Sequence, residues 1–115
     1  KLPEKIRRNM TESIKSEKFN TKYGLATESI KSSAYEADGY WRGPIWAPST
    51  MIILDGMREC GENEFVQEIT HKFCRMVQKS GCAENFDALT GCGLRDRAYT
   101  WTASVMLVMA HEYLN

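Results

Sequence analysis

The sequence lacks an excess of charge of either sign, because Lys and Arg together count 15 and so do Asp and Glu. A chain without a basic excess lacks the electrostatic footprint of nucleic-acid-binding proteins and the attraction to anionic membrane surfaces. Its longest uncharged stretch, from Ala98 to Ala110, is too short to span a bilayer. We therefore expect neither nucleic acid nor a membrane as a partner. The first ten residues contain no apolar run of the kind found in signal peptides.

The cysteines, Cys60, Cys74, Cys82 and Cys92, form no CxxC pair. They are interpreted as reduced, partly buried thiols of a cytoplasmic protein. Two alternatives remain open: a zinc site from Cys60, His71, Cys74 and Cys82, and a disulfide between Cys82 and Cys92. Glycine-rich phosphate loops, GxSxG and HExxH are absent as well. No cofactor and no metal are predicted.

Hydrophobic periodicity predicts an all-α chain of about four helices with two long loops. The helices are expected at residues 3–18, 48–60, 63–80 and 100–113, with Asn63 and Thr100 as N-caps and Gly61 and Gly81 as stops. The second helix has an alternative start at Pro44. The clearest apolar stripe lies on the third helix (Phe65, Val66, Ile69, Phe73, Met76, Val77). The last helix is apolar all round, which predicts burial on most sides.

The predicted loops, residues 19–47 and 82–98, carry the polar and aromatic side chains that are candidates for binding or catalysis. The first loop is long enough to include a short strand. The first ends in Tyr-Trp-Arg-Gly-Pro-Ile-Trp, residues 40–46. Aromatic faces stack on sugar rings and arginine donates a planar fork, although such a cluster also suits simple packing. The second holds Glu84 in Glu-Asn-Phe-Asp, and its Asp87-to-Gly91 segment is typical of a turn.

These segments resemble a known family. The order of Phe-Asn-Thr-Lys-Tyr-Gly-Leu (19–25), the 40–46 motif, Glu-Asn-Phe-Asp-x-x-Thr-Gly (84–91) and Tyr-Thr-Trp-Thr-Ala-Ser (99–104) resembles the C-terminal end of (α/α)6-barrel glycosidases. Within these glycosidases the segments look like those of glycoside hydrolase family 63 and its bacterial relatives, with kinship to trehalases and glycogen-debranching glucosidases. The resemblance implies a fragment of an (α/α)6 toroid, with residues 1–115 as the C-terminal segment of a catalytic domain.

The resemblance also implies roles for individual residues. Glu84 corresponds to the general base of an inverting enzyme that acts on α-glucosidic or related bonds. The sugar-binding residues it implies are Tyr40, Trp41, Arg42, Trp46, Tyr99 and Trp101. We expect Glu84 to share a cleft with Trp41, Arg42 and Trp101. The family's general acid lies in an upstream motif that this sequence does not contain, so the isolated chain is expected to be inactive.

The expected partner is an oligosaccharide or glycoside substrate. The alternative is a non-catalytic helical module that binds a glycan or a protein. We also expect self-association through helices that would pack against missing neighbours, namely the apolar stripe of residues 65–77 and the last helix.

Overall fold

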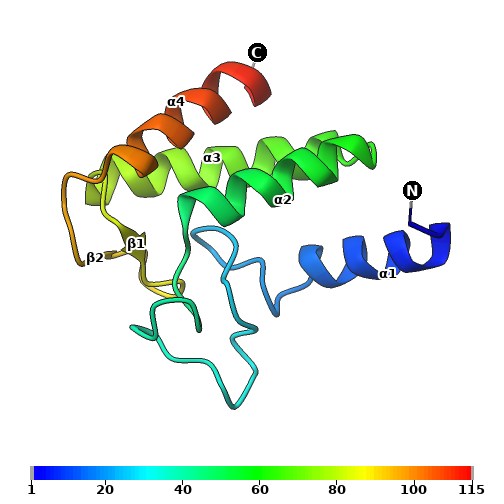
Figure 1. The fold of residues 1–115 in the computed structure, drawn as a ribbon, viewed down its shortest axis with the longest axis horizontal. Coiled ribbons are helices and arrows are strands. Elements are labelled where there is room, and N and C mark those ends of the chain that lie inside the picture. Colours follow the sequence, from blue (N-terminus) through cyan, green and yellow to red (C-terminus); the bar gives the residue numbers. More distant parts are fainter. Residues whose placement is uncertain (1, 115) are drawn as a thin grey trace.

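The computed structural model describes residues 2–114, and four helices dominate it (Figure 1). They are α1 (Glu4–Lys15), α2 (Ala47–Glu59), α3 (Asn63–Ser80) and α4 (Thr100–Tyr113). Between α3 and α4 lies a two-stranded antiparallel hairpin, β1 (Asn85–Phe86) and β2 (Gly93–Leu94). The all-α prediction is confirmed. The hairpin was not predicted, and the first loop holds isolated bridges in place of a strand.

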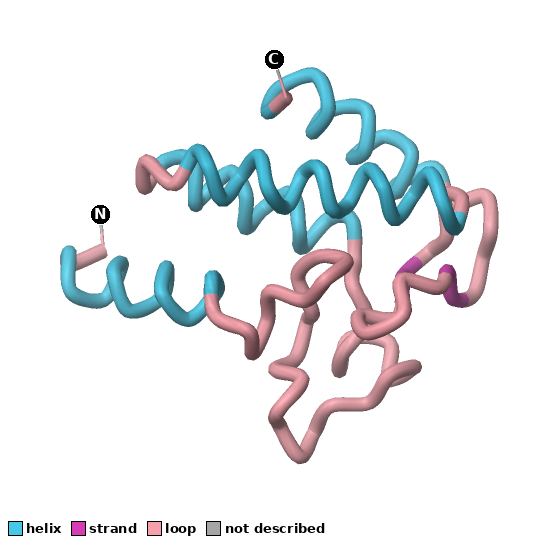
Figure 2. The backbone as a smooth tube through the Cα atoms, turned by 180° about the vertical axis from the view of Figure 1, so that it is seen from behind, coloured by secondary structure: helices cyan, strands magenta, loops and turns pink. Residues whose placement is uncertain are grey.

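The three C-terminal helices pack on one another, and α1 lies apart from them. In Figure 2, α2 and α3 form a helical hairpin with α4 across them, and the long loop of residues 16–46 connects α1 to this group. The same view places that loop beside the β hairpin, at one end of the helices. The loops that carry the motif residues are therefore neighbours in space.

Helix boundaries follow from local chemistry. Gly61 (φ +82°) and Gly81 (φ +79°) end α2 and α3 in a conformation that glycine adopts freely, as predicted. The alternative start of α2 at Pro44 is wrong, because that segment is extended and the helix begins at Ala47.

The predicted caps Asn63 and Thr100 are wrong by one residue. The N-cap positions are Glu62 and Tyr99, and neither side chain makes a capping hydrogen bond. The Tyr99 amide donates to the Cys82 carbonyl (2.9 Å), which holds Tyr99 in extended backbone, so that its own carbonyl opens the helix.

The apolar stripe of α3 forms the centre of the core, because all six of its members are at most 4% exposed. Leu54 and Met57 of α2 and Val105 and Met109 of α4 close over it. The stripe is therefore not a bare face, which corrects that part of the self-association prediction.

Other apolar side chains remain open to solvent. Leu107 is 70% exposed on α4, so the predicted burial of this helix on most sides is wrong for the described chain. The physical reason is that α2 and α3 cover only one side of it. On α1, the apolar side chains of Ile6 and Met10 are about half exposed (47% and 49%).

All four cysteines are free thiols; Cys74 and Cys82 are partly buried, whereas Cys60 and Cys92 are exposed. Within residues 2–114, no three His, Cys, Asp or Glu side chains come close enough together to hold a metal ion. No helix in this range combines the length and apolar character needed to cross a bilayer.

Tyr113 ties the end of α4 to α2 and generates a prediction on stability. Its hydroxyl donates to the Asp55 carboxylate, and burial, followed by this bond, raises the pKa of Tyr113 to about 12. The folded state thus retains the phenol proton at pH values where the unfolded chain loses it. The resulting stability is fully present below about pH 10 and is lost as the pH rises towards 12, by up to about 2–3 kcal/mol.

Urea unfolding between pH 8 and pH 12 checks this expectation against Tyr113→Phe, which has no phenol proton at this position. We expect the difference in unfolding free energy between the two proteins to shrink with rising pH. A difference that stays constant over the whole range would contradict it.

Candidate active site

A pair of backbone hydrogen bonds joins the two motif-bearing loops. The Ile45 amide donates to the Phe86 carbonyl (2.7 Å), and the Phe86 amide donates to the Ile45 carbonyl (3.0 Å). Both residues are fully buried. Phe86 also lies opposite Gly93 in the hairpin, so Ile45 pairs with the other edge of β1. The bridge brings residues 40–46 and 84–86 together despite their separation in sequence.

The two tryptophans of the first loop form a stack with one buried and one open member. The Trp41 and Trp46 rings are nearly parallel (9°), with centroids 3.9 Å apart. Trp46 is 1% exposed, and its indole N–H donates to the Tyr40 carbonyl (2.9 Å). Trp41 is 46% exposed. Trp41 can therefore offer a surface to a sugar ring, whereas Trp46 supports it from the interior.

Tyr40 connects this stack to Glu84. Its hydroxyl donates to Oε1 of Glu84 (2.9 Å), and its ring meets the Trp46 ring edge-on at 4.8 Å. The hydrogen bond to Glu84 is the largest cause of the raised pKa of Tyr40, because the phenolate could not donate it. The second carboxylate oxygen of Glu84 accepts no hydrogen bond within residues 2–114. A half-buried carboxylate with one oxygen held and one oxygen open is suited to act on a water molecule.

Tyr99 and Trp101 lie where α4 begins, with ring centroids 6.3 Å apart. Hydrogen bonds attach this helix start, and the loop before it, to the segment that carries Glu84. Thr102 donates its hydroxyl to the Ala83 carbonyl (2.6 Å), and the Glu84 amide donates to the Asp96 carbonyl (2.8 Å). Tyr99 also raises the pKa of Tyr40, though less than Glu84 does. Trp101 is 47% exposed.

Arg42 lies beside the stack in sequence but pairs with Glu36 (2.8 Å), and both side chains are more than half exposed. Direct contacts thus unite Tyr40, Trp41, Trp46 and Glu84. A cleft shared by Glu84 with Arg42 and Trp101 stays a prediction.

Other acidic side chains of the second loop serve local structure. Asp87 Oδ1 accepts from the amides of Leu89 (2.8 Å) and Thr90 (3.1 Å), and Gly91 follows with φ +73°. The predicted turn at this segment is confirmed. Asp96 accepts in the same way from the Ala98 amide (2.8 Å).

Sequence reasoning missed Arg95. This side chain bonds Asp38 (2.6 Å) in the first loop and Asn85 (3.2 Å) beside Glu84, and its guanidinium lies 4.7 Å from the centroid of the Tyr40 ring. An arginine in an irregular loop carries no periodicity, so the sequence offers no signal for these contacts. Asn85 is fully buried, and its Nδ2 has no partner within residues 2–114.

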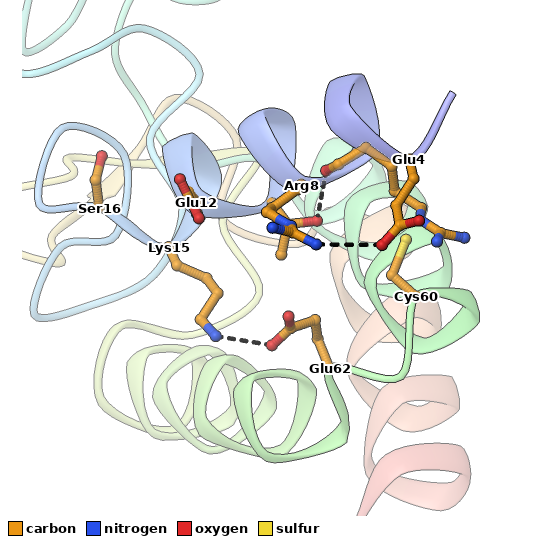
Figure 3. Close-up of a pocket in the computed structure, with 9 residues that line it drawn as sticks. Glu4, Arg8, Glu12, Lys15, Ser16, Cys60 and Glu62 are labelled. Carbon is orange, nitrogen blue, oxygen red and sulfur yellow. Dashed lines mark hydrogen bonds and ion pairs between the residues drawn. The ribbon is translucent and has the colours of Figure 1, made fainter. Parts of the chain in front are cut away.

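The surface has several hollows, of which one lies away from these aromatic residues and another is lined by Trp41. A polar one of about 500 Å³ separates α1 from the α2–α3 turn, and it contains the Lys15–Glu62 and Arg8–Glu4 ion pairs (Figure 3). Four of its six charged side chains thus pair with one another. An apolar pocket of about 330 Å³ lies along one side of Trp41, between the first loop and α2.

Comparison with known proteins gives consistent matches. The family model of the mannosylglycerate hydrolase MGH1-like glycoside hydrolase domain matches residues 1–102. Mannosylglycerate hydrolase MGH1 of Selaginella moellendorffii is 29% identical over 74% of this chain and 17% of its own length. The mannosylglycerate hydrolase of Rubrobacter radiotolerans is 30% identical over 64% of this chain and 16% of its own length. The chain therefore spans about a sixth of these curated relatives.

The solved structures agree on the fold. The GH63 mannosylglycerate hydrolase from Thermus thermophilus, in complex with Tris and D-glycerate, superposes with a TM-score of 0.81 at 24% identity. The match covers 91% of this chain and 26% of that one. The arrangement of helices is thus that of part of an (α/α)6 toroid, as predicted.

The division between Trp41 and Trp46 generates a prediction. Trp46→Ala should lower the unfolding free energy by about 3–5 kcal/mol, because it opens a cavity in the interior. Trp41→Ala removes a half-exposed ring and should cost well under half of that. Denaturant unfolding of the two variants measures the contrast, and equal costs would contradict the assignment of Trp46 as the support.

Proposed function

Because the chain belongs to the mannosylglycerate hydrolase MGH1-like glycoside hydrolase family, we propose that it contributes the general base and part of the sugar subsite of an inverting glycoside hydrolase. The observation that carries this proposal is the hydrogen bond from Tyr40 to Glu84. This bond supports the proposal because Tyr40, whose ring centroid lies 6.0 Å from that of Trp41, holds one oxygen of the Glu84 carboxylate and leaves the other available. The matched segment makes up only 17% of the relative's chain, so the activity belongs to the whole protein.

In the proposed step, Oε2 of Glu84 accepts a proton from a water molecule. The water oxygen forms a bond to the anomeric carbon while the bond from that carbon to the leaving oxygen breaks. Attack from the face opposite the leaving group inverts the configuration. Tyr40 continues to donate to Oε1, so the carboxylate keeps its direction as its charge is neutralised.

A second carboxyl group must protonate the leaving oxygen, about 6.5–9.5 Å from the first. The acidic neighbours of Glu84 already have partners. Asp87 and Asp96 accept from backbone amides, and Asp38 pairs with Arg95. We therefore propose that the general acid comes from outside residues 2–114 and that this chain alone has no turnover.

For the substrate, we propose a sugar glycoside whose ring stacks on Trp41. Arg42, Tyr99 and Trp101 would contact its hydroxyl groups and edges. Mannosylglycerate is the first compound to test, because the relatives are mannosylglycerate hydrolases. α-Glucosides are the second, because the sequence resembles glycosidases that act on them.

The test is Glu84→Gln in the full-length protein. Glutamine keeps the shape and the acceptor for Tyr40 but cannot take up the proton. We expect kcat to fall by about 10²–10⁴-fold, with sugar binding retained. Proton NMR of the first sugar released by the wild-type protein should show the inverted anomer. Glu64→Gln, at an exposed position of α3, is the matched control.

Turnover that survives Glu84→Gln would refute the base assignment. If neither protein cleaves any glycoside and both bind sugars equally, the non-catalytic glycan-binding module becomes the better description.

We also propose that the chain, when separate from further toroid helices, self-associates through open apolar side chains. Ile52 of α2 is 72% exposed and Leu107 of α4 is 70% exposed. Surfaces of this kind favour contact with another protein surface. Light scattering of the 115-residue chain at micromolar concentration should show a mass above 13.2 kDa.

The double variant Ile52→Lys/Leu107→Lys should shift that mass towards the monomer, whereas Gln78→Lys, an exposed polar position on α3, should not. A wild-type chain that is monomeric under these conditions would contradict the proposal.

A further inference from the structure

Two residues adopt a backbone conformation that side chains other than glycine rarely take. Within residues 2–114, Tyr40 and Arg95 are the non-glycine residues with positive φ, each at +62°. This conformation is strained for residues with a Cβ atom, and it persists where other contacts hold it. The two side chains face each other, with the guanidinium 4.7 Å from the ring centroid. Both strained residues lie beside Glu84, which indicates that surrounding contacts fix the backbone at this site.

Arg95 makes contacts on both sides of the junction between the loops. Nη1 donates to Oδ1 of Asp38 (2.6 Å) and to Oδ1 of Asn85 (3.2 Å), and Nη2 donates to the Asp38 carbonyl (3.3 Å). One planar group thereby holds the first loop just before Tyr40 and the second loop just after Glu84. The guanidinium is suited to this, because its donors have fixed directions.

We propose that Arg95 is a positioning residue that holds the phenol of Tyr40 on the carboxylate of Glu84. The Ile45–Phe86 bridge fixes the two backbones, but it leaves the Tyr40 side chain, on a residue 39% exposed, free to turn into solvent. The guanidinium above the Tyr40 ring restricts that movement. The catalytic consequence of this role rests on the proposed function, whereas the geometric role does not.

The buried amide of Asn85 adds to the argument. Its Oδ1 accepts from Arg95, which sets the orientation of the amide, and its Nδ2 has no partner within the described chain. Removal of Arg95 would leave the whole amide unsatisfied in the interior. Such groups cost enough to rearrange the local backbone, and here that backbone carries Glu84.

The pKa of the Tyr40 phenol distinguishes a positioning role of Arg95 from a purely electrostatic one. Three groups act on its pKa: Glu84 and Tyr99 raise it, and the positive charge of Arg95 lowers it. If Arg95 acts only as a nearby charge, Arg95→Ala must raise the pKa of Tyr40 further. If Arg95 holds Tyr40 on Glu84, its loss breaks the hydrogen bond that raises the pKa of Tyr40 most, and that pKa falls towards the ordinary range of a tyrosine. The two hypotheses predict opposite signs.

The experiment is a pH titration of tyrosine 13Cζ resonances in the full-length protein, with Tyr40 assigned as the signal absent from Tyr40→Phe. We expect the pKa of Tyr40 to fall in Arg95→Ala. Asp38→Ala, which keeps the arginine, should shift it in the same direction by less, because the bond to Asn85 remains. Arg97→Ala is the control, since Arg97 lies in the same loop and makes no hydrogen bond or ion pair within residues 2–114.

A pKa of Tyr40 that rises or stays constant in Arg95→Ala would overturn the proposal, and so would no shift in Asp38→Ala if the first variant fails to fold. In turnover assays, Arg95→Ala should lower kcat by about 10- to 100-fold with KM little changed. Full activity of Glu84→Gln, together with the expected fall of the Tyr40 pKa in Arg95→Ala, would refute the proposed function. The positioning role of Arg95 would then still be supported.

Discussion

The backbone bridge between Ile45 and Phe86 is the constraint on which the candidate site depends. Its two hydrogen bonds lie in a fully buried place, where an unpaired amide or carbonyl would be costly. A slip of one residue would turn every neighbouring side chain to the opposite face. Tyr40 would then lose Glu84, and Trp46 would leave the interior. The bridge is itself tied to the scaffold, because the Phe86 ring meets Phe73 of α3 edge-on at 6.1 Å.

Residues of the same type in one motif differ in how far the fold buries them. Trp41 and Trp46 belong to one motif, and both were assigned to the sugar subsite, yet only Trp41 presents a ring to solvent. Their different roles follow from the Ile45–Phe86 bridge, which draws Trp46 inwards with its neighbour in the chain. The same reasoning applies to α4, whose apolar surface is covered by α2 and α3 on one side alone. Exposure is a property of the packed neighbours, so a single sequence cannot specify it.

Sequence reasoning succeeded where a local rule decides the outcome. The 3.6-residue period of α3 predicted its six buried members, and the Asp87-to-Gly91 segment predicted its own turn. It failed where a distant partner competes with the local rule. Thr100 does not cap α4, because the Tyr99 amide already donates to Cys82. Strands of two residues are too short to show alternation, so the β hairpin left no pattern. Arg95 was missed for the same reason, since its partners Asp38 and Asn85 come from two separate loops.

A site on loops needs contacts that make it rigid. Here a series of contacts leads from the Glu84 carboxylate at the surface to the helical core. Glu84 is held by Tyr40, and the Tyr40 carbonyl accepts from Trp46, the residue directly before α2. Arg95 supports the same pair from the solvent side, where packing is weakest. The strain at Tyr40 and Arg95 is consistent with this arrangement, because an unfavourable φ survives only when contacts on both sides prevent its relaxation. The direction of the Glu84 carboxylate is thus determined jointly by the helical core and by one exposed arginine.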